Sequence, residues 1–283
     1  MDKGWYQVNS KKNLFTILAA VCLFGLMACV HSGVSPTAEE TKGVPATSGI
    51  QFDFARSASL SVISPVEKEV LTLKNFQVGT GTNRMLIVGV QVEEGGKENI
   101  GDMVISSITY GDRTLTLIPG SEVQLSSKWR GKEYFLKVSV YYLVEPPSGK
   151  LDITVTFAGK VTSANVGAIS LFNTEQAAPV NLVTNQKKNP SGKQEIITKI
   201  TTRNDGAWVI DILGNGKRKT RMENKTKDYI QRFQAMEETG GKSTLVGGTL
   251  FVPTVGEVTL HWIQRRWMIN RLAHVVLEIA PHK

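Results

Sequence analysis

Cysteine is scarce in this chain of 283 residues, which contains only Cys22 and Cys29. Both lie close to the N-terminus, so the rest of the chain cannot form the disulfide framework that stabilises many exported domains. The fold must therefore be stabilised by burial of apolar side chains. The roughly 225 residues that follow position 57 are enough to build a sizeable core.

Catalytic signatures are also missing. The four histidines are His31, His261, His274 and His282, and none has the HExxH spacing that binds catalytic zinc. No GxSxG nucleophile elbow is found either. These absences favour a protein that is not an enzyme, and we interpret the histidines as core or surface residues with satisfied hydrogen bonds. A hydrolase stays open as an alternative, because the members of a triad can lie far apart in sequence.

The chain has no apolar run as long as a transmembrane helix, which needs about 20 residues. Its longest apolar run, residues 14–25, follows Lys11 and Lys12 and precedes the small residue Ala28. A positive segment, a short apolar segment and a small residue before a cleavage site are the layout of a secretory signal. We therefore predict a signal peptide over residues 1–28.

The end of this segment, Leu26-Met27-Ala28-Cys29, resembles the lipobox of bacterial lipoproteins. The resemblance implies cleavage before Cys29 and attachment of diacylglyceryl and further acyl groups, such as palmitate, to that residue. Two or more acyl chains hold a protein stably on a bilayer. Val30 follows Cys29, and by resemblance to lipoprotein sorting this favours the outer membrane if the organism is Gram-negative. We expect a lipid-anchored protein of the bacterial cell envelope.

Residues 29–56 are expected to form the lipidated cysteine and a flexible tether. They are rich in Ser, Thr, Pro and Gly and have no sustained hydrophobic period. Such a segment buries too little apolar surface to fold alone. Loss of residues 1–28 removes three lysines and one aspartate, which lowers the formal net charge from +8 to about +6 and leaves an attraction to acidic surfaces.

Short alternating runs begin near residue 57 and predict β-strands. Three runs show the period of two most clearly, with one face apolar and the other mostly polar: residues 85–92, 136–144 and 151–157. Glycine, proline and asparagine turns separate such runs, and no long stretch keeps a helical period. About thirteen strands without interleaved helices predict an all-β, antiparallel, two-sheet β-sandwich of the jelly-roll type over residues 57–283.

A faint internal similarity leaves the organisation of this domain open. The hairpin-like stretch from Leu143 to Val155 resembles the stretch from Leu250 to Trp262, and an apolar strand follows each. One interpretation is that sandwich hairpins look alike, and we favour a single sandwich on this ground. The alternative is two related halves, residues 57–175 and 176–283.

The strand cores and turns also resemble a secreted bacterial β-sandwich module of mostly unassigned function. The resembling stretches are residues 82–90, 105–112, 138–149, 166–172 and 267–281. The resemblance implies the fold and secretion, and it carries no catalytic residues.

Three groups of residues are candidates for ligand contacts. Trp129 and Trp267 lie in polar, turn-like stretches, where an indole can stack on a sugar ring or cap the core. Lys217, Arg218, Lys219 and Arg221 form a basic loop that suits phosphates or sulfates, or is simply solvated. Glu93, Glu94, Glu98 and Asp102 flank a Gly-Gly turn and offer oxygens to a structural Ca2+, although their spacing matches no strict motif.

We therefore expect a membrane-anchored lipoprotein that displays a non-catalytic β-sandwich for binding or adhesion to a glycan or an acidic envelope polymer. No cofactor other than a structural Ca2+ is expected, and nucleic acid is not the expected partner. The first alternative is a structural or assembly lipoprotein that docks another envelope protein. The second is a hydrolase with a cryptic site.

Overall fold

The computed structural model describes residues 49–61, 68–95, 103–129, 132–161, 163–189, 195–216, 221–236, 243–264 and 270–283. The expected signal peptide, lipobox and most of the expected tether lie outside these residues. The described residues belong to one compact unit that starts at Ala46. Within them, no helix has the length and apolarity needed to cross a membrane.

Nearly all regular structure among the described residues is antiparallel β-sheet, which confirms the expected β-sandwich. The described residues form eighteen strands where about thirteen were expected, partly because β5, β6 and β14 have only two or three residues and show no readable alternation. The strands up to Phe172 are β1 (Gln51–Ser61), β2 (Lys68–Val78), β3 (Met85–Gly95), β4 (Ile105–Tyr110), β5 (Arg113–Thr114), β6 (Thr116–Leu117), β7 (Val123–Trp129), β8 (Lys132–Val144), β9 (Gly149–Val161) and β10 (Ser163–Phe172). The later strands are β11 (Leu182–Asn189), β12 (Glu195–Thr201), β13 (Ala207–Asn215), β14 (Met222–Asn224), β15 (Ile230–Met236), β16 (Thr244–Val252), β17 (Glu257–Gln264) and β18 (Asn270–Ile279).

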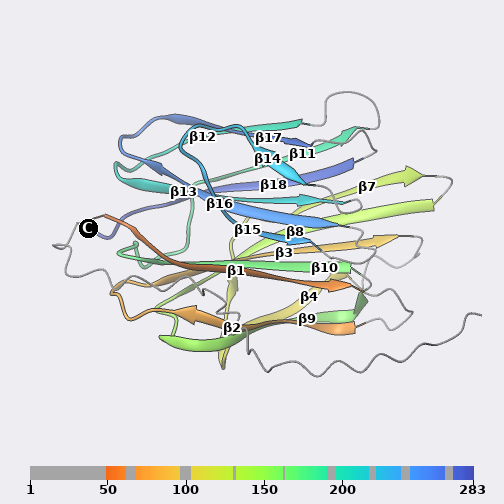
Figure 1. Cartoon of the computed structure of the whole chain (residues 1–283), viewed down its shortest axis with the longest axis horizontal. Coiled ribbons are helices and arrows are strands. Elements are labelled where there is room, and N and C mark those ends of the chain that lie inside the picture. Colours follow the sequence, from red (N-terminus) through yellow and green to blue (C-terminus); the bar gives the residue numbers. More distant parts are fainter. Residues whose placement is uncertain are drawn as a thin grey trace, which may run out of the picture. The chain divides into compact units, whose positions relative to one another are not determined.

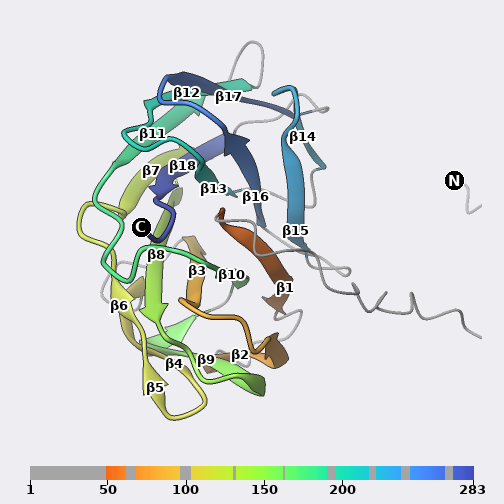
Figure 2. The ribbon, with the colours of Figure 1, turned by 90° about the vertical axis from the view of Figure 1, so that its left-hand side faces the viewer.

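The strands form four sheets. Sheet I has the order β2-β9-β4-β5, and sheet II has the order β1-β10-β3-β8-β6, with β7 also paired to β8. Sheet III has the order β11-β18-β13-β16-β15, and sheet IV has the order β12-β17-β14. Figure 2 shows these sheets as successive layers. Every strand pairing among the described residues stays within residues 51–172, called half one, or within residues 182–279, called half two.

The two halves have the same topology. Sheet III repeats the order β1-β10-β3-β8-β7 of sheet II, strand for strand, as β11-β18-β13-β16-β15, and sheet IV repeats β2-β9-β4 as β12-β17-β14. In each half the first strand pairs with the last, as in a jelly roll. The domain is therefore two tandem sandwiches, an arrangement that corresponds to the alternative of two related halves.

Sheets II and III pack against each other and join the halves. Their facing side chains form one apolar cluster, to which Ile87, Val138 and Ile169 contribute from half one and Ile212 and Val275 from half two. The expected polar outer face of β3 and β8 is therefore wrong for this region, because sheet II is covered by sheet I on one side and by sheet III on the other. Close packing here requires glycine: a Cβ on Gly167 would lie 2.0 Å from the Phe233 ring.

The expected tether is shorter than residues 29–56. Residues 51–56 belong to β1, which pairs with β10 from Gln51 opposite Phe172 to Ser61 opposite Ser163. Phe52 and Phe54 of this segment pack against different apolar clusters. The folded domain therefore begins at or before Gln51, inside the segment that was expected to be tether.

Candidate functional site

Because the two halves share one topology, each core position in half one has an equivalent in half two. The hairpin similarity aligns Leu143 with Leu250, and the strand pairings extend the alignment across the sheets: Leu143 pairs with Leu86, and Leu250 pairs with Val209. Four core positions that are aliphatic in half one are occupied by polar or aromatic residues in half two. The pairs are Leu73 and Thr198, Val88 and Asp211, Val155 and Trp262, and Val166 and His274.

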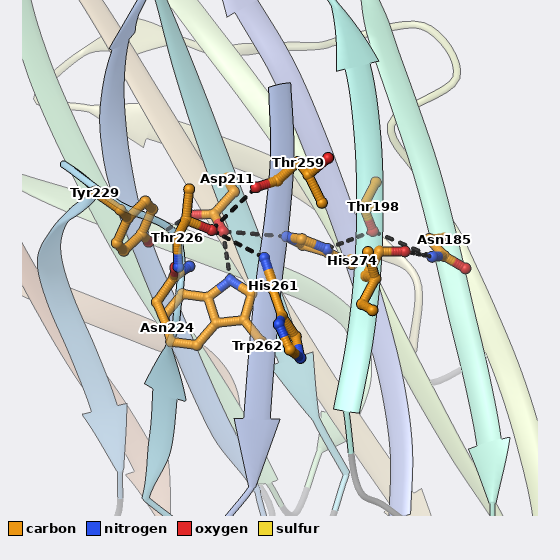
Figure 3. A network of polar contacts seen from close by, with 11 residues as sticks. Asn185, Thr198, Asp211, Asn224, Thr226, Tyr229, Thr259, His261, Trp262 and His274 are labelled. Carbon is orange, nitrogen blue, oxygen red and sulfur yellow. Dashed lines mark hydrogen bonds and ion pairs between the residues drawn. The ribbon is translucent and has the colours of Figure 1, made fainter. Parts of the chain in front are cut away.

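The side chains of half two at these four positions form a network with Tyr229 between sheets III and IV (Figure 3). We call this network the polar belt: Thr198, Asp211, Tyr229, Trp262 and His274. Asp211 is its centre. Its Oδ1 accepts a hydrogen bond of 2.5 Å from the Tyr229 hydroxyl. Its Oδ2 accepts one of 2.5 Å from Trp262 Nε1 and lies 3.2 Å from His274 Nε2.

The belt continues through His274 to the edge of sheet III. Asn185 Nδ2 donates to Thr198 Oγ1 over 3.2 Å, and Thr198 Oγ1 lies 2.8 Å from His274 Nδ1. The Thr198 hydroxyl and His274 Nδ1 thus share a hydrogen bond, and His274 connects Thr198 to Asp211 through its two ring nitrogens.

A hydroxyl, an imidazole and a carboxylate in this order also form the triad of nucleophilic hydrolases. Thr198 is 2 % exposed, and His274 and Asp211 are fully buried. A substrate therefore does not reach the hydroxyl in this structure. The belt instead divides the interior of half two into two apolar clusters, whereas half one has a single continuous cluster on the equivalent strands.

Electrostatics favour the neutral form of Tyr229. Burial raises the pKa of the Tyr229 hydroxyl well above its ordinary value, and the negative charge of Asp211 raises it further. The hydroxyl therefore keeps its proton and donates it to the carboxylate. With Trp262 and His274 also donating, the carboxylate of Asp211 is bound by three groups and needs no metal to be stable in the core.

A second buried polar group joins the two halves. Arg271 of β18 donates through Nη2 to Glu93 of β3 and, over 2.8 Å, to the carbonyl of Gly216. Through Nη1 it donates to Ser127 Oγ of β7 over 2.7 Å, and its guanidinium carbon lies 5.5 Å from the centre of the Tyr134 ring. Glu93 and Arg271 are each about 4 % exposed, so this is a buried ion pair.

This ion pair shows that strand ends of both halves meet. We call the end of the domain at which β3, β7, β13 and β17 terminate the distal end; the chain enters β1 at the opposite end (Figure 1). Trp129 is the last residue of β7 and pairs with Lys132 at the distal end. Exposed Arg221 precedes β14, whose first residue pairs with the last residue of β17.

The other predicted ligand residues are placed only by their neighbours in the chain. Trp267 follows β17, and Lys217, Arg218 and Lys219 follow β13; all four lie outside the described residues. The same is true of Glu98 and Asp102, which follow β3, and of Leu26, Met27, Ala28 and Cys29.

The predicted calcium ligands Glu93 and Glu94 are not in a solvated loop but are buried in β3. As successive residues of a strand they point to opposite faces of sheet II, so they do not converge on one ion. Among the described residues, no three His, Cys, Asp or Glu side chains come together as metal ligands do.

Sequence reasoning treated His274 as a core residue with satisfied hydrogen bonds but missed its partners. A signal was present, because Asp211 interrupts an otherwise apolar run from Trp208 to Leu213. Reading that run against its equivalent, Met85 to Val90, would have shown a carboxylate where half one has Val88.

Comparison with known proteins adds no relative. No family model, no curated protein and no solved structure matches this chain.

Proposed function

We propose that this protein is a lipid-anchored lipoprotein of the bacterial cell envelope, in the outer membrane if the organism is Gram-negative, whose double sandwich is a non-catalytic binding module. Its ligand is a glycan or an acidic envelope polymer, bound at the distal end. The observation that supports this most directly is the meeting of strand ends from both halves there, beside Trp129 and Arg221.

The position of the entry point fits this proposal. The chain enters at Gln51, which pairs with Phe172, and β1 runs from there to Ser61 at the distal end. An eleven-residue strand is about 35 Å long. The distal end is thus turned away from the point at which an N-terminal anchor would connect, and it is available to a polymer. The formal net charge of the chain is +8 and falls to about +6 without residues 1–28, and this basic excess favours an acidic polymer.

Binding is tested with the chain from Ala46 onward on an array of glycans and on acidic polymers such as lipopolysaccharide and teichoic acid. We expect one class to bind and Trp129→Ala or Arg221→Ala to weaken it, and binding of an acidic polymer to fall with added salt. Trp208→Ala, at the opposite end, is the matched control. Absence of any binding in this screen would contradict the proposal.

Anchoring has a separate test. In cells, Cys29→Ala is expected to move the protein from the membrane fraction to the soluble fraction, because the thiol that carries the lipid is gone. Cys22→Ala is the control and should stay membrane-bound. A Cys29→Ala protein that remains anchored would refute the lipoprotein assignment.

The docking of another envelope protein is a second candidate, favoured by one exposed apolar surface. Ile230 and Phe251 are 52 % and 54 % exposed. They lie on one face of sheet III. Ile230 pairs with Thr249 and points to the same face as Thr249, and Phe251, two residues further along β16, points to that face too. If this candidate is correct, the wild type will bind no polymer, and Ile230→Ser and Phe251→Ser will reduce co-purification of a specific envelope protein.

A further inference from the structure

Three exposed apolar side chains lie at the end of half two that is opposite the distal end, and we call them the proximal patch: Val180, Phe251 and Val255. They are 79 %, 54 % and 51 % exposed, respectively. Phe251 is the second-last residue of β16, and Val255 lies in the turn between β16 and β17. Val180 lies just before β11.

Hydrogen bonds hold the segments that carry the proximal patch in place. The backbone N–H of Val255 donates to Asp205 Oδ1 over 2.7 Å. In the same loop, the backbone N–H of Asn204 donates to the carboxylate of Glu278 over 2.9 Å, and this carboxylate also accepts from the side chain of Asn181, which adjoins the patch. Glu278 is only 4 % exposed. The patch is therefore presented by a fixed framework built around a buried carboxylate.

The fold does not require exposed apolar side chains at this end. The hairpin similarity aligns Phe251 with Val144 of half one and Val255 with Ser148. Val144 packs against the apolar cluster between sheets II and III, and Ser148 is exposed but polar. The same hairpin is thus built in half one with a polar turn. Exposed apolar side chains that gather in one place mark an interaction surface.

The proximal patch lies beside the strand by which the chain enters the domain. The guanidinium carbon of Arg232 lies 3.7 Å from the centre of the Phe52 ring and 5.8 Å from the centre of the Trp208 ring. Phe52 is the second residue of β1, and Trp208 pairs with Phe251. A single arginine therefore connects the entry of the chain to the strand pair that carries the patch.

The length of chain that precedes the domain limits what can cover the patch. Nineteen residues lie between Cys29, the expected lipid-bearing residue, and Gly49. Even a fully extended chain of this length reaches at most about 70 Å. A connection this short keeps the proximal end at a roughly millimolar effective concentration next to the bilayer. At such a concentration a small apolar surface is enough for docking.

The charged side chains next to the patch in the chain offset one another. Arg203 and Asp205 are both exposed in one loop, and Glu257, which follows the turn of Val255, pairs with Lys199 over 2.7 Å. The surface around the patch therefore has little net charge. Its contact with a bilayer depends on burial of apolar side chains at the boundary between headgroups and acyl chains.

We propose that the proximal patch is a membrane contact: in the anchored protein, Val180, Phe251 and Val255 dock on the bilayer that holds the lipid of Cys29. This inference rests on the anchor of the proposed function and adds which end of the domain faces the membrane. Docking at the patch turns the distal end away from the bilayer and toward the polymer.

The first test places a fluorescent label beside the patch. In the mature, acylated protein Cys29 carries lipid and Cys22 has left with the signal peptide, so Thr254→Cys supplies the only free thiol. The protein, labelled with nitrobenzoxadiazole, is incorporated into vesicles of phosphatidylethanolamine and phosphatidylglycerol with a quencher near the headgroups. We expect a blue shift and quenching at residue 254. We expect little of either with Ser148→Cys, in the equivalent turn of half one, and none with Lys128→Cys at the distal end.

The second test removes the apolar side chains and keeps the label at residue 254. The combined change Val180→Ser, Phe251→Ser and Val255→Ser is expected to abolish the blue shift and most of the quenching, with Tm unchanged and the protein still on the vesicles through its lipid. Val70→Ser, which alters a valine of half one that is 43 % exposed, is the matched control and should change neither signal. Added salt should not reduce the quenching, because the contact is apolar, whereas it weakens binding of an acidic polymer at the distal end.

Three results would overturn the inference. One is equal quenching at residues 254 and 148, and another is quenching at residue 254 that survives the three serine changes. The third is a label that is already shielded in the chain from Ala46 onward without vesicles, because a protein would then cover the patch. If the inference fails while Cys29→Ala releases the protein and a polymer binds, the proposed function stands. A mature protein that carries no acyl chain would contradict both proposals.

Discussion

The polar belt makes a quantitative prediction about Asp211→Val, which places in half two the residue that half one has at the equivalent Val88. The substitution removes the acceptor of three donors: the indole of Trp262, the hydroxyl of Tyr229 and the imidazole of His274. The Trp262 and His274 donors are buried completely. Leaving a buried donor unpaired costs about 1–3 kcal/mol, so we expect a loss of about 3–6 kcal/mol in the free energy of unfolding. This is a large part of the 5–15 kcal/mol that is typical of a folded domain.

The measurement is urea unfolding of the chain from Ala46 onward, followed by tryptophan fluorescence and far-UV circular dichroism. His274→Val and the double variant complete a mutant cycle. Because Val at both positions removes a donor together with its acceptor, the double variant should lose about 1–2 kcal/mol less than the sum of the single variants. A loss below about 1 kcal/mol for Asp211→Val, or strict additivity in the cycle, would refute the belt as a structural unit.

Three further predictions test the fold. Burial raises the pKa of the Tyr141 hydroxyl to about 12 from 10.0. The stability that the protonated hydroxyl contributes is therefore complete below pH 10 and is lost as the pH rises to 12. In urea unfolding over this pH range, Tyr141→Phe should lose about 2–3 kcal/mol less free energy of unfolding than the wild type. Gly167→Ala would place a Cβ 2.0 Å from the Phe233 ring, and should lower Tm, with partial rescue by Phe233→Leu. Arg271→Met removes the guanidinium that pairs with the buried Glu93 and should cost about 3–5 kcal/mol in urea unfolding, whereas the additional change Glu93→Gln should recover part of it.

Much of the fold follows from local pattern. In β9 the apolar residues Ile153, Val155 and Phe157 alternate with polar ones, and its burial alternates in the same way. This period of two is a property of the extended backbone and identifies both the strand and its inner face. The short strand β14 escaped prediction because three residues are too few to show a period.

The candidate site was less predictable. Trp129 and Arg221 were singled out by composition, and the structure places both at the distal end, although their strands and loops are far apart in sequence. Asn215 and Gln264 were not singled out, because each is a single polar residue at the end of an apolar strand. Only the strand pairings show that Asn215 and Gln264 end β13 and β17 at the distal end and that, among the described residues, their side chains include amide atoms without a partner.

The sequence by itself determined that this is an antiparallel β-protein without a disulfide framework. The similarity of the stretch Leu143–Val155 to the stretch Leu250–Trp262 left a repeated unit open as the alternative to a single sandwich. Only the tertiary structure decided that the repeat is two complete sandwiches, that both faces of β3 are buried, and that Asp211 meets His274 inside half two. The physical reason is that alternation fixes the faces of one strand, whereas the choice of which faces meet depends on packing between residues more than sixty positions apart.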